Sequence, residues 1–227
     1  MIGIIFAMKE ELDSFINDLK INKKNKIYDL EFYEVDYLNL KLVLVLSGVG
    51  KVNAARSTQI LIDNYDIKYI INAGVAGGIS LDLKVLDIVV GNALIQHDFD
   101  ITVFNHEKGY IPNVGTFIEC DKKLVSLAKE SGNVRTGVIA SGDIFLTDLN
   151  MSRKINTKFQ ALCVEMEGAS VAQVAKLCNI PFLVIRCISD NGDNKMVYEE
   201  FLENSCQVIG RYLKELLNNL SKNENIC

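Results

Sequence analysis

Short runs of apolar residues alternate along this chain with longer segments whose apolar residues recur every three or four positions. The short runs are apolar at successive positions, which is typical of strands buried in a parallel sheet that helices cover on both faces. Such runs lie at residues 2–6, 69–72, 86–90 with a continuation toward 95, 134–140, 161–164 and 182–188. The helical spacing predicts helices at residues 8–19, 51–64, 121–131, 151–159, 167–178 and 198–220.

An early pair of runs modifies this pattern. Residues 32–35 and 41–46, with a turn near Asn39, are typical of a β-hairpin, which makes the sheet mixed. The chain has no internal repeat and no linker-like stretch, and its 227 residues correspond to one domain. We therefore predict a single-domain, three-layer α/β/α fold with a mixed, mostly parallel twisted sheet. The domain is expected to span residues 1–227, with 221–227 as a frayed tail.

Charge and hydropathy argue against several classes of protein. The net charge of −5 has the wrong sign for binding phosphate backbones, and the one basic cluster, at residues 20–26, is interpreted as a solvated loop. The apolar runs are far shorter than the ~20 residues that cross a bilayer. The apolar N-terminus lacks a basic leader and is typical of a first strand, not of a signal peptide. We expect no nucleic-acid partner and no membrane association.

The cysteines and histidines argue against disulfides and metal sites. Six cysteines occur without a C-x-x-C pair; Cys163 and Cys187 fall inside apolar strand-like runs, and Cys178 lies on the apolar face of a predicted helix. We interpret them as small buried hydrophobic residues in a reducing cytoplasm. The chain has only two histidines, which provide few ligands for a zinc site. We expect neither a metal nor a cofactor.

Three glycine-bearing turns each follow a predicted strand, at residues 47–51, 74–78 and 141–143. Glycine lets the backbone approach a ligand closely, although a tight turn alone explains any one of them. Asn53 stands where the dinucleotide fingerprint requires Gly or Ala, and Val45 stands where a P-loop requires Gly. The loops therefore match neither of the common phosphate-binding motifs.

Charged residues occur where buried strands should have none. Arg186 interrupts the apolar run 182–188 and must find a carboxylate or another acceptor, since an unpaired buried charge costs several kcal/mol. Glu11, Glu167 and Asp190 follow the carboxyl ends of predicted strands, where open α/β sheets bind ligands. Each acid alone could stabilise a helix or cap a turn. Together, without a nucleophilic Ser or Cys motif, they favour acid/base chemistry on a glycosyl-type bond.

Several segments match one known family in register from residue 1 to about residue 215. They are 1–12 (MIGIIFAMKEEL), 46–52 (LSGVGKV), 71–78 (INAGVAGG), 86–90 (LDIVV), 141–146 (SGDIFL), 164–168 (VEMEG) and 184–190 (VIRCISD). With them the chain resembles the 5′-methylthioadenosine/S-adenosylhomocysteine nucleosidases of the nucleoside phosphorylase/hydrolase superfamily. The more specific part of the resemblance is A-M-x-x-E near the start together with V-E-M-E and R-x-I-S-D.

The resemblance implies hydrolysis of the N-ribosidic bond of 5′-methylthioadenosine and S-adenosylhomocysteine, which releases adenine and a 5-thio-substituted ribose. By match to the family motifs, Asp190 would donate a proton to adenine N7, and Glu11 would orient and deprotonate the attacking water. Glu167 would hydrogen-bond the ribose hydroxyls, and Arg186 would help to fix the water or that carboxylate. Asp190 must then hold a proton near neutral pH while Glu11 is ionised, so we expect the two acids to lie in different environments.

The resemblance also implies which residues hold the substrate. Phe145 would stack on adenine, and the backbone of Leu146 would bind the edge of the base. The other expected substrate-binding residues, in the ribose and alkylthio region, are Met8, Val49, Val75, Met166, Ser189 and Tyr198. In this family the neighbouring subunit closes the pocket, so the resemblance implies a homodimer in which Phe104 and Pro112 complete the partner's site.

Two positions depart from the family pattern. Val75 stands where the family commonly has Ser, so one side-chain hydrogen bond near the ribose is absent. Tyr198 stands near the last predicted helix after a shorter loop than the family has, in place of a different aromatic residue.

Three alternative functions remain open. A purine nucleoside phosphorylase shares the fold but attacks with phosphate, which requires Arg donors at the glycine loops, whereas acidic Glu11 lies where the anion would go. The cations near these loops are Lys9, Lys51 and Arg186. A hydrolase of a related nucleoside, such as futalosine, is closer to the pattern. A non-catalytic nucleoside-binding module would be expected to lose Glu11 or Asp190 while keeping Phe145, and this chain keeps all three.

Overall fold

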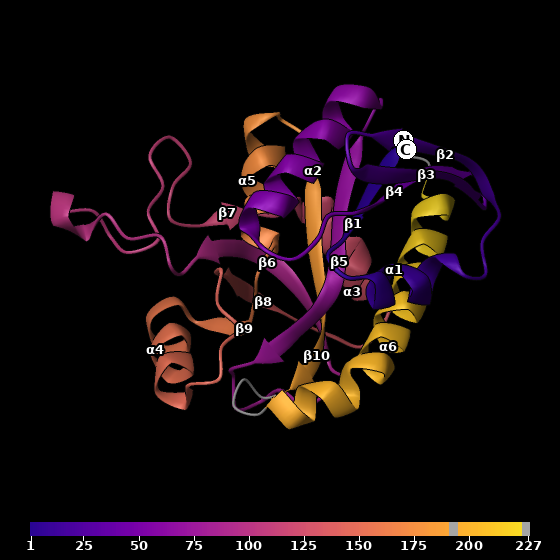
Figure 1. Cartoon of the computed structure of the whole chain (residues 1–227). Coiled ribbons are helices and arrows are strands. Elements are labelled where there is room, and N and C mark those ends of the chain that lie inside the picture. Colours follow the sequence, from indigo (N-terminus) through magenta and orange to yellow (C-terminus); the bar gives the residue numbers. More distant parts are fainter. Residues whose placement is uncertain (191–194, 224–227) are drawn as a thin grey trace.

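The computed structural model describes residues 1–190 and 195–223, with side chains described at residues 1–190 and 201–223. Strands and helices alternate along this part of the chain, as the sequence predicts (Figure 1). The strands are β1 (Ile2–Phe6), β2 (Ile21–Ile27), β3 (Leu30–Tyr37), β4 (Leu40–Leu46), β5 (Tyr69–Gly78), β6 (Ile88–Gln96), β7 (Ile118–Glu119), β8 (Val134–Ser141), β9 (Ala161–Glu165) and β10 (Phe182–Asp190). The helices are α1 (Lys9–Ile16), α2 (Lys51–Asn64), η1 (Thr102–Phe104, a 3₁₀ turn), α3 (Lys122–Glu130), α4 (Leu149–Phe159), α5 (Gly168–Leu177) and α6 (Lys195–Lys222).

These strands form one mixed sheet with the order β10-β6-β8-β9-β5-β1-β4-β3-β2, and β7 pairs with β6. Parallel pairs form the middle of the sheet: β1 with β4 and β5, β5 with β10, and β8 with β6 and β9. The hairpins and the β6–β10 pair are antiparallel. Because β10 also pairs with β5, the strands β5, β10, β6, β8 and β9 form a closed ring.

Helices cover both faces of the central strands. Side chains alternate between the two faces of a strand, so positions 3 and 6 of β1 point in opposite directions. A Cβ on Gly3 would lie 2.5 Å from Leu61 of α2. The ring of Phe6 lies 6.2 Å, between centroids, from the ring of Phe15 of α1. Figure 1 shows α2 beside α5 in one group and α1 beside α6 in the other, which confirms the three-layer prediction.

The strands with apolar residues at successive positions form the core. All residues of β1 and β10 are buried, and so are most of those in β4 and β5. This explains why Arg186, in the middle of β10, is only 2% exposed. None of the helices in the described ranges has the length and the apolar character that a membrane span requires.

The prediction of a solvated loop at residues 20–26 is wrong. This segment forms most of β2, a strand at the edge of the sheet that pairs with β3. Lys23 and Lys24 remain in solvent and form ion pairs with Glu34 and Glu31 across the hairpin. Opposite charges on facing strands stabilise such a pairing, and lysines protect an edge from other strands. Because β2 is stabilised by ion pairs and not by burial, its sequence lacks the apolar pattern from which strands are predicted.

The predicted glycine turn at residues 74–78 is also wrong, because this segment continues β5. It pairs there with β10 and, at its end, with β9. Glycine is needed at position 74 for another reason: a Cβ on Gly74 would lie 2.5 Å from Oε1 of Glu11. The absence of a side chain at Gly74 thus allows the Glu11 carboxylate of α1 to lie against the backbone of β5.

Two smaller predictions need correction. Cys120, Cys163, Cys187 and Cys206 are free and buried, but Cys178 is partly exposed at the end of α5, so its predicted burial is wrong. The predicted tail at residues 221–227 starts too early, because α6 continues to Lys222. Residues 224–227, which include Cys227, lie outside the described part of the chain.

Candidate active site

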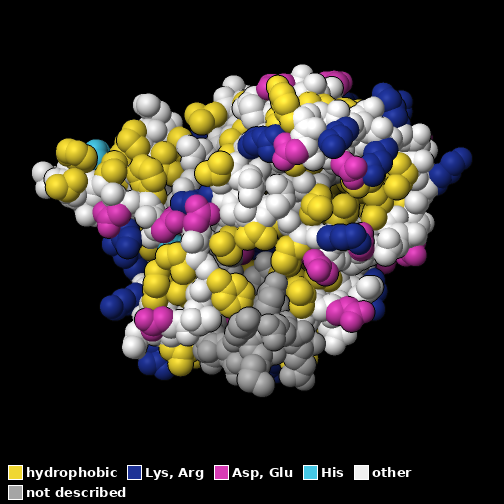
Figure 2. Space-filling model, in the orientation of Figure 1, with side chains coloured by type: hydrophobic (Ala, Val, Ile, Leu, Met, Phe, Trp, Pro, Cys, Tyr) yellow, Lys and Arg dark blue, Asp and Glu magenta, His cyan; other side chains and the backbone are white. Residues whose placement is uncertain are grey.

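A cavity of about 330 Å³ lies at the carboxyl ends of β5, β9 and β10. Its lining also comes from the start of α1, from the loop before α2 and from the loop after β8. Figure 2 shows a hollow on this face of the molecule, bordered in part by hydrophobic side chains. The described lining residues are Ala7, Met8, Glu11, Val49, Val75, Ala76, Gly77, Ile144, Phe145, Leu146, Val164, Glu165, Met166, Glu167, Ser189 and Asp190.

The structure brings most of the sequence-predicted site residues to this cavity. Those that line it are Met8, Glu11, Val49, Val75, Phe145, Leu146, Met166, Glu167, Ser189 and Asp190. Arg186 lies in the core, on the same strand as Asp190. Phe104 and Pro112 do not line the cavity; both are exposed on the segment between β6 and β7, which Figure 1 shows extending away from the rest of the molecule. Tyr198 belongs to α6, and its side chain lies outside the described part of the structure.

Glu11 is buried in the first turn of α1 and accepts hydrogen bonds from three backbone N–H groups. Its Oε2 accepts from Ala7 (3.0 Å) and Met8 (2.9 Å), and its Oε1 accepts from Val75 (2.9 Å). Burial raises the pKa of Glu11 above its ordinary value, while the charge of Arg186 and the three N–H groups act in the opposite direction. The carboxylate is therefore held in one position, in a dry site that increases its basicity.

Glu167 lies immediately before α5, and its Oε1 accepts a hydrogen bond of 2.8 Å from the backbone N–H of Gly50. Burial raises the pKa of Glu167 well above its ordinary value, and the charge of Glu165 raises it further. The charge of Arg186 opposes both effects, and Glu11 adds a smaller upward contribution. One guanidinium thus faces several carboxylates whose protonation states depend on one another.

Asp190 is the last residue of β10 and is 5% exposed. The hydroxyl of Ser189 donates a hydrogen bond of 2.9 Å to Oδ2 of Asp190. The pairing of β10 with β5 shifts between Ile188 and Asp190, which is the signature of a β-bulge. A bulge redirects the side chain that follows it, so this irregularity explains how Asp190 leaves the strand pattern and lines the cavity.

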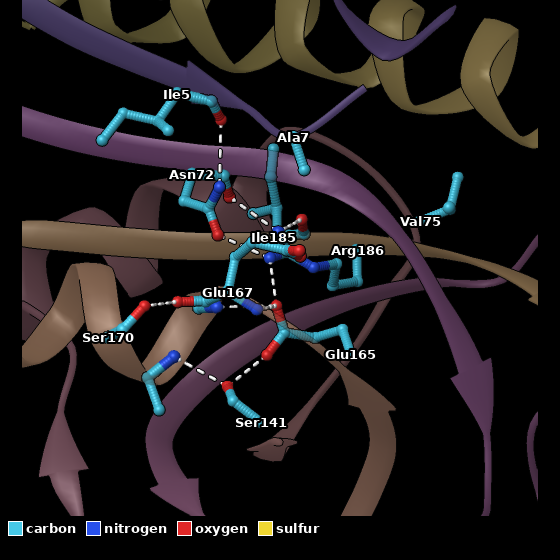
Figure 3. Close-up of polar contacts among 12 residues, drawn as sticks. Ile5, Ala7, Asn72, Val75, Ser141, Glu165, Glu167, Ser170, Ile185 and Arg186 are labelled. Atoms are coloured by element: carbon cyan, nitrogen blue, oxygen red, sulfur yellow. Dashed lines mark hydrogen bonds and ion pairs between the residues drawn. The ribbon is translucent and has the colours of Figure 1, made fainter. Parts of the chain in front are cut away.

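Arg186 joins four strands through hydrogen bonds in the core (Figure 3). Its guanidinium donates to Oε2 of Glu165, in a buried ion pair, and to Oδ1 of Asn72. It also donates to the backbone carbonyls of Asn72 (3.2 Å) and Ile185 (3.0 Å). Nδ2 of Asn72 in turn donates to the carbonyl of Ile5 at 3.0 Å. The network therefore fixes β1, β5, β9 and β10 relative to one another.

Glu165, the last residue of β9, connects this network to α5. Its Oε2 accepts hydrogen bonds from the backbone N–H groups of Glu167 (3.1 Å) and Gly168 (2.7 Å). Its Oε1 accepts from the hydroxyl of Ser141, whose oxygen accepts from the backbone N–H of Ala169 at 2.7 Å. One carboxylate thus neutralises Arg186 and caps the start of α5, which determines where Glu167 lies.

Glu165, Asn72 and Ser141 are not among the site residues predicted from the sequence. The resemblance implies that Arg186 fixes the water or Glu167, but the carboxylate to which Arg186 is bonded is Glu165. A signal for Glu165 was available, because it ends an apolar strand and a lone buried arginine requires a carboxylate. Asn72 and Ser141 gave no such signal, since their contacts depend on the order of strands in the sheet.

The remaining lining of the cavity is mostly apolar. Met8, Val49 and Met166 contribute to it, and the loop after β8 adds Ile144, Phe145 and Leu146. Phe145 is 46% exposed, although large apolar side chains are normally buried. Apolar walls with a few fixed polar groups are typical of sites for small organic ligands.

The charge of the cavity limits the chemistry that it supports. Its charged lining residues are Glu11, Glu165, Glu167 and Asp190. No Lys or Arg lines it among the residues that the structure describes, and in the same ranges no group of His, Cys, Asp or Glu is arranged to hold a metal ion. Carboxylates in unlike environments suit proton transfer, and their charge disfavours an anionic co-substrate.

Comparisons with known proteins agree on the family. The sequence profile of the phosphorylase superfamily matches residues 1–218. A 5′-methylthioadenosine/S-adenosylhomocysteine nucleosidase of Bacillus pumilus is 39% identical over 227 residues, which cover 94% of this chain and 98% of the relative. This chain belongs to the same nucleosidase family.

Other nucleosidases of the superfamily are nearly as similar. An aminodeoxyfutalosine nucleosidase of Helicobacter pylori is 36% identical over 96% of this chain and 99% of its own length. The crystal structure of S-adenosylhomocysteine nucleosidase from Streptococcus pyogenes, in complex with 5-methylthiotubericidin, matches with a TM-score of 0.93 and 33% identity and covers 96% of each chain. The family and the fold class predicted from the sequence are therefore confirmed.

Glu165→Gln tests the buried ion pair. We expect it to lower the free energy of unfolding by about 3 kcal/mol, because the buried charge of Arg186 loses the carboxylate that neutralises it. Urea denaturation followed by circular dichroism measures the change. The matched control is Glu31→Gln, which breaks an exposed pair with Lys24 and is expected to leave the stability nearly unchanged. Equal effects of the two substitutions would contradict the role assigned to Glu165.

Glu167→Gln tests the raised pKa of Glu167. The folded protein retains a proton on this carboxyl at pH values where the unfolded chain has released it. Stability should therefore fall as the pH rises above the ordinary glutamate pKa of ~4.3 toward the raised folded value. We expect the free energy of unfolding to fall less steeply with pH in Glu167→Gln than in the wild type. Parallel curves from denaturant titrations at a series of pH values would exclude the shift.

Proposed function

We propose that this protein hydrolyses the N-ribosidic bond of 5′-methylthioadenosine and S-adenosylhomocysteine and releases adenine and the 5-thioribose product. The observation that carries the proposal is the presence of Glu11, Glu167 and Asp190 in one cavity with apolar walls and no lining cation in the described ranges. The family membership supports the same reaction class.

Asp190 is the proposed general acid. Adenine is a poor leaving group as an anion, so protonation at N7 is the largest single contribution that the enzyme can make to breaking the bond. Asp190 is nearly fully buried at the end of β10, and the Ser189 hydroxyl is bonded to its Oδ2. Burial favours the neutral form of a carboxyl group, which is the form that can donate a proton.

Glu11 is the proposed general base that orients and deprotonates the attacking water. Three backbone N–H groups favour its ionised form, and burial increases its basicity. The same bonds prevent the carboxylate from turning away, so that a water molecule meets an acceptor already in place.

Glu167 is proposed to bind the ribose hydroxyls. Arg186 is proposed to favour the ionised form of Glu167. The ribose becomes oxocarbenium-like as the bond breaks, and nearby carboxylates stabilise the positive charge that develops. Arg186, bonded to Glu165, balances part of this negative charge in the resting enzyme. Its contribution is therefore electrostatic and structural, and it acts through Glu165.

The apolar lining fits the two ends of a thio-nucleoside. Phe145 is proposed to stack on adenine, with the backbone of Leu146 at the edge of the base. Met8, Val49 and Met166 are proposed to contact the ribose and the alkylthio group, where each buried CH₂ contributes ~0.8 kcal/mol. Val75, Ser189 and Tyr198 complete the proposed set of substrate-binding residues.

The charges around the cavity favour water over phosphate as the nucleophile. The three cationic side chains near the glycine loops, which could bind phosphate, already have carboxylate partners. Lys9 pairs with Asp13, Lys51 with Asp98 and Arg186 with Glu165. A phosphate would enter among carboxylates without a free guanidinium to bind it. We therefore reject the phosphorylase alternative.

Hydrolysis of an aminodeoxyfutalosine-type nucleoside is a second candidate function. It is favoured by the 36% identity to a Helicobacter pylori relative that carries that name, over 99% of the relative's length. A non-catalytic binding module is disfavoured, because the chain retains Glu11 and Asp190 beside Phe145 in one cavity. A substrate panel that follows free base separates these candidates.

We also propose that the chain acts as one domain, in the cytoplasm, as part of methionine salvage, and as a homodimer. Phe104 is 71% exposed on the segment between β6 and β7, together with exposed Pro112, which supports their proposed position in the site of a neighbouring subunit. The cysteines in the described part of the chain are free of disulfides, which supports a reducing compartment.

The purified protein is expected to release adenine from 5′-methylthioadenosine in phosphate-free buffer. Asp190→Asn is expected to lower kcat at least ~10³-fold and to leave the Kd for the substrate within a few-fold, because the amide cannot donate the proton but keeps the shape. Asp36→Asn, at an exposed position of β3, is the matched control and should retain full activity. A strict requirement for phosphate, or near wild-type turnover by Asp190→Asn, would contradict the mechanism.

Mixing two impaired variants tests the shared site. Glu11→Gln keeps Phe104 but lacks the base, and Phe104→Ala keeps the base but lacks the proposed contact with the partner's substrate. In a mixed dimer, one site has Glu11 from the second variant and Phe104 from the first, so we expect the mixture to be more active than the sum of its parts. Simple additivity after subunit exchange would contradict the contribution of Phe104.

A further inference from the structure

A second network of charged groups lies beside the cavity, outside the residues assigned to the mechanism. Lys51, the first residue of α2, donates from Nζ to Oδ1 of Asp98 at 2.7 Å. Oδ2 of Asp98 accepts from the backbone N–H of Asp143 at 3.0 Å, and Oδ1 of Asp143 accepts from the backbone N–H of Lys51 at 2.8 Å. These three residues form a closed ring of hydrogen bonds, which we call the loop clamp.

The loop clamp joins two loops that line the cavity but lie far apart in the sequence. The loop before α2 contributes Val49 and the Gly50 N–H that is bonded to Glu167. The loop after β8 contributes Phe145 and Leu146 and has no helical or strand structure. Asp143, two residues before Phe145, connects this second loop to Lys51 and Asp98 through its hydrogen bonds.

The ion pair of the loop clamp is partly shielded from solvent. The side chains of Lys51 and Asp98 are 17% and 20% exposed, so salt screens their attraction less than that of a surface pair. Burial acts to raise the pKa of Asp98, but the bonds from Lys51 and Asp143 hold it below its ordinary value, which keeps the carboxylate charged. Nζ of Lys51 also donates to Gln96 at 3.1 Å.

We propose that Lys51 and Asp98 are positioning residues, whose ion pair holds the loop after β8 in place and thereby sets the affinity for the nucleobase. The inference rests on the proposed function, in which Phe145 and Leu146 contact the base. These two residues would contact the base equally before and during bond cleavage. Loss of the clamp should therefore weaken the binding of the base and leave the chemical step intact.

The test compares Lys51→Met, Asp98→Asn and the double variant. In each, KM for 5′-methylthioadenosine and the Kd for free adenine, measured by calorimetry, are expected to rise about tenfold, with kcat within about twofold of wild type. The double variant should bind adenine no more weakly than either single variant, because all three lose the same clamp. Lys51→Arg keeps the charge and should recover most of the affinity.

The control is Lys214→Met, which breaks an ion pair of 2.8 Å between α6 and Asp18 in the turn after α1. It should change neither KM nor the Kd for adenine. If Lys51→Met does not fold, as judged by circular dichroism, the nearly isosteric Asp98→Asn decides the test.

Wild-type affinity for adenine in Asp98→Asn, or a fall in kcat at unchanged KM, would overturn the proposal. A wild-type protein that releases no adenine would contradict the proposed function itself. An active wild type with an unaffected Asp98→Asn would contradict the loop clamp alone.

Discussion

A charged guanidinium in the dry interior of β10 is the group on which the arrangement of the site depends. Arg186 is tolerable there only because Glu165 and Asn72 bind it from neighbouring strands. Glu165 ends β9, which pairs with β8, and its carboxylate also accepts from the backbone N–H groups of Glu167 and Gly168 at the start of α5. Pairing one buried charge therefore fixes the ends of several strands and the position of Glu167 at the start of α5.

The same charge balance connects the fold to the proposed chemistry. A cavity lined by carboxylates repels phosphate but accommodates water and a sugar that becomes positively charged as its bond to the base breaks. Burial makes the pKa of Glu11 and that of Glu167 higher than usual, and Arg186 limits both effects. The protonation of both carboxyl groups therefore depends on burial, on the charge of Arg186 and on the backbone N–H groups from which each accepts.

Much of the fold could be predicted from the sequence, because strands buried on both faces have a clear apolar pattern, as in β1 and β10. The position of Glu11, Glu167 and Asp190 after predicted strands likewise indicates a shared site, and the structure brings them to one cavity. The edge strand β2 was missed because ion pairs such as Lys24–Glu31 stabilise it without an apolar pattern. Asn72 and Ser141 could not be predicted, because their contacts depend on the order of strands, which a single sequence does not contain.

In the proposed mechanism, water held by Glu11 attacks the sugar carbon as the protonated base leaves. Running a single turnover of 5′-methylthioadenosine in ¹⁸O-enriched water with phosphate also present, and analysing the products by mass spectrometry, tests it most directly. If water is the nucleophile, the heavy oxygen will be found in the released thioribose, at the carbon that carried adenine, and no sugar phosphate will form. A phosphorylated sugar, or a thioribose without the label, would contradict the proposed mechanism.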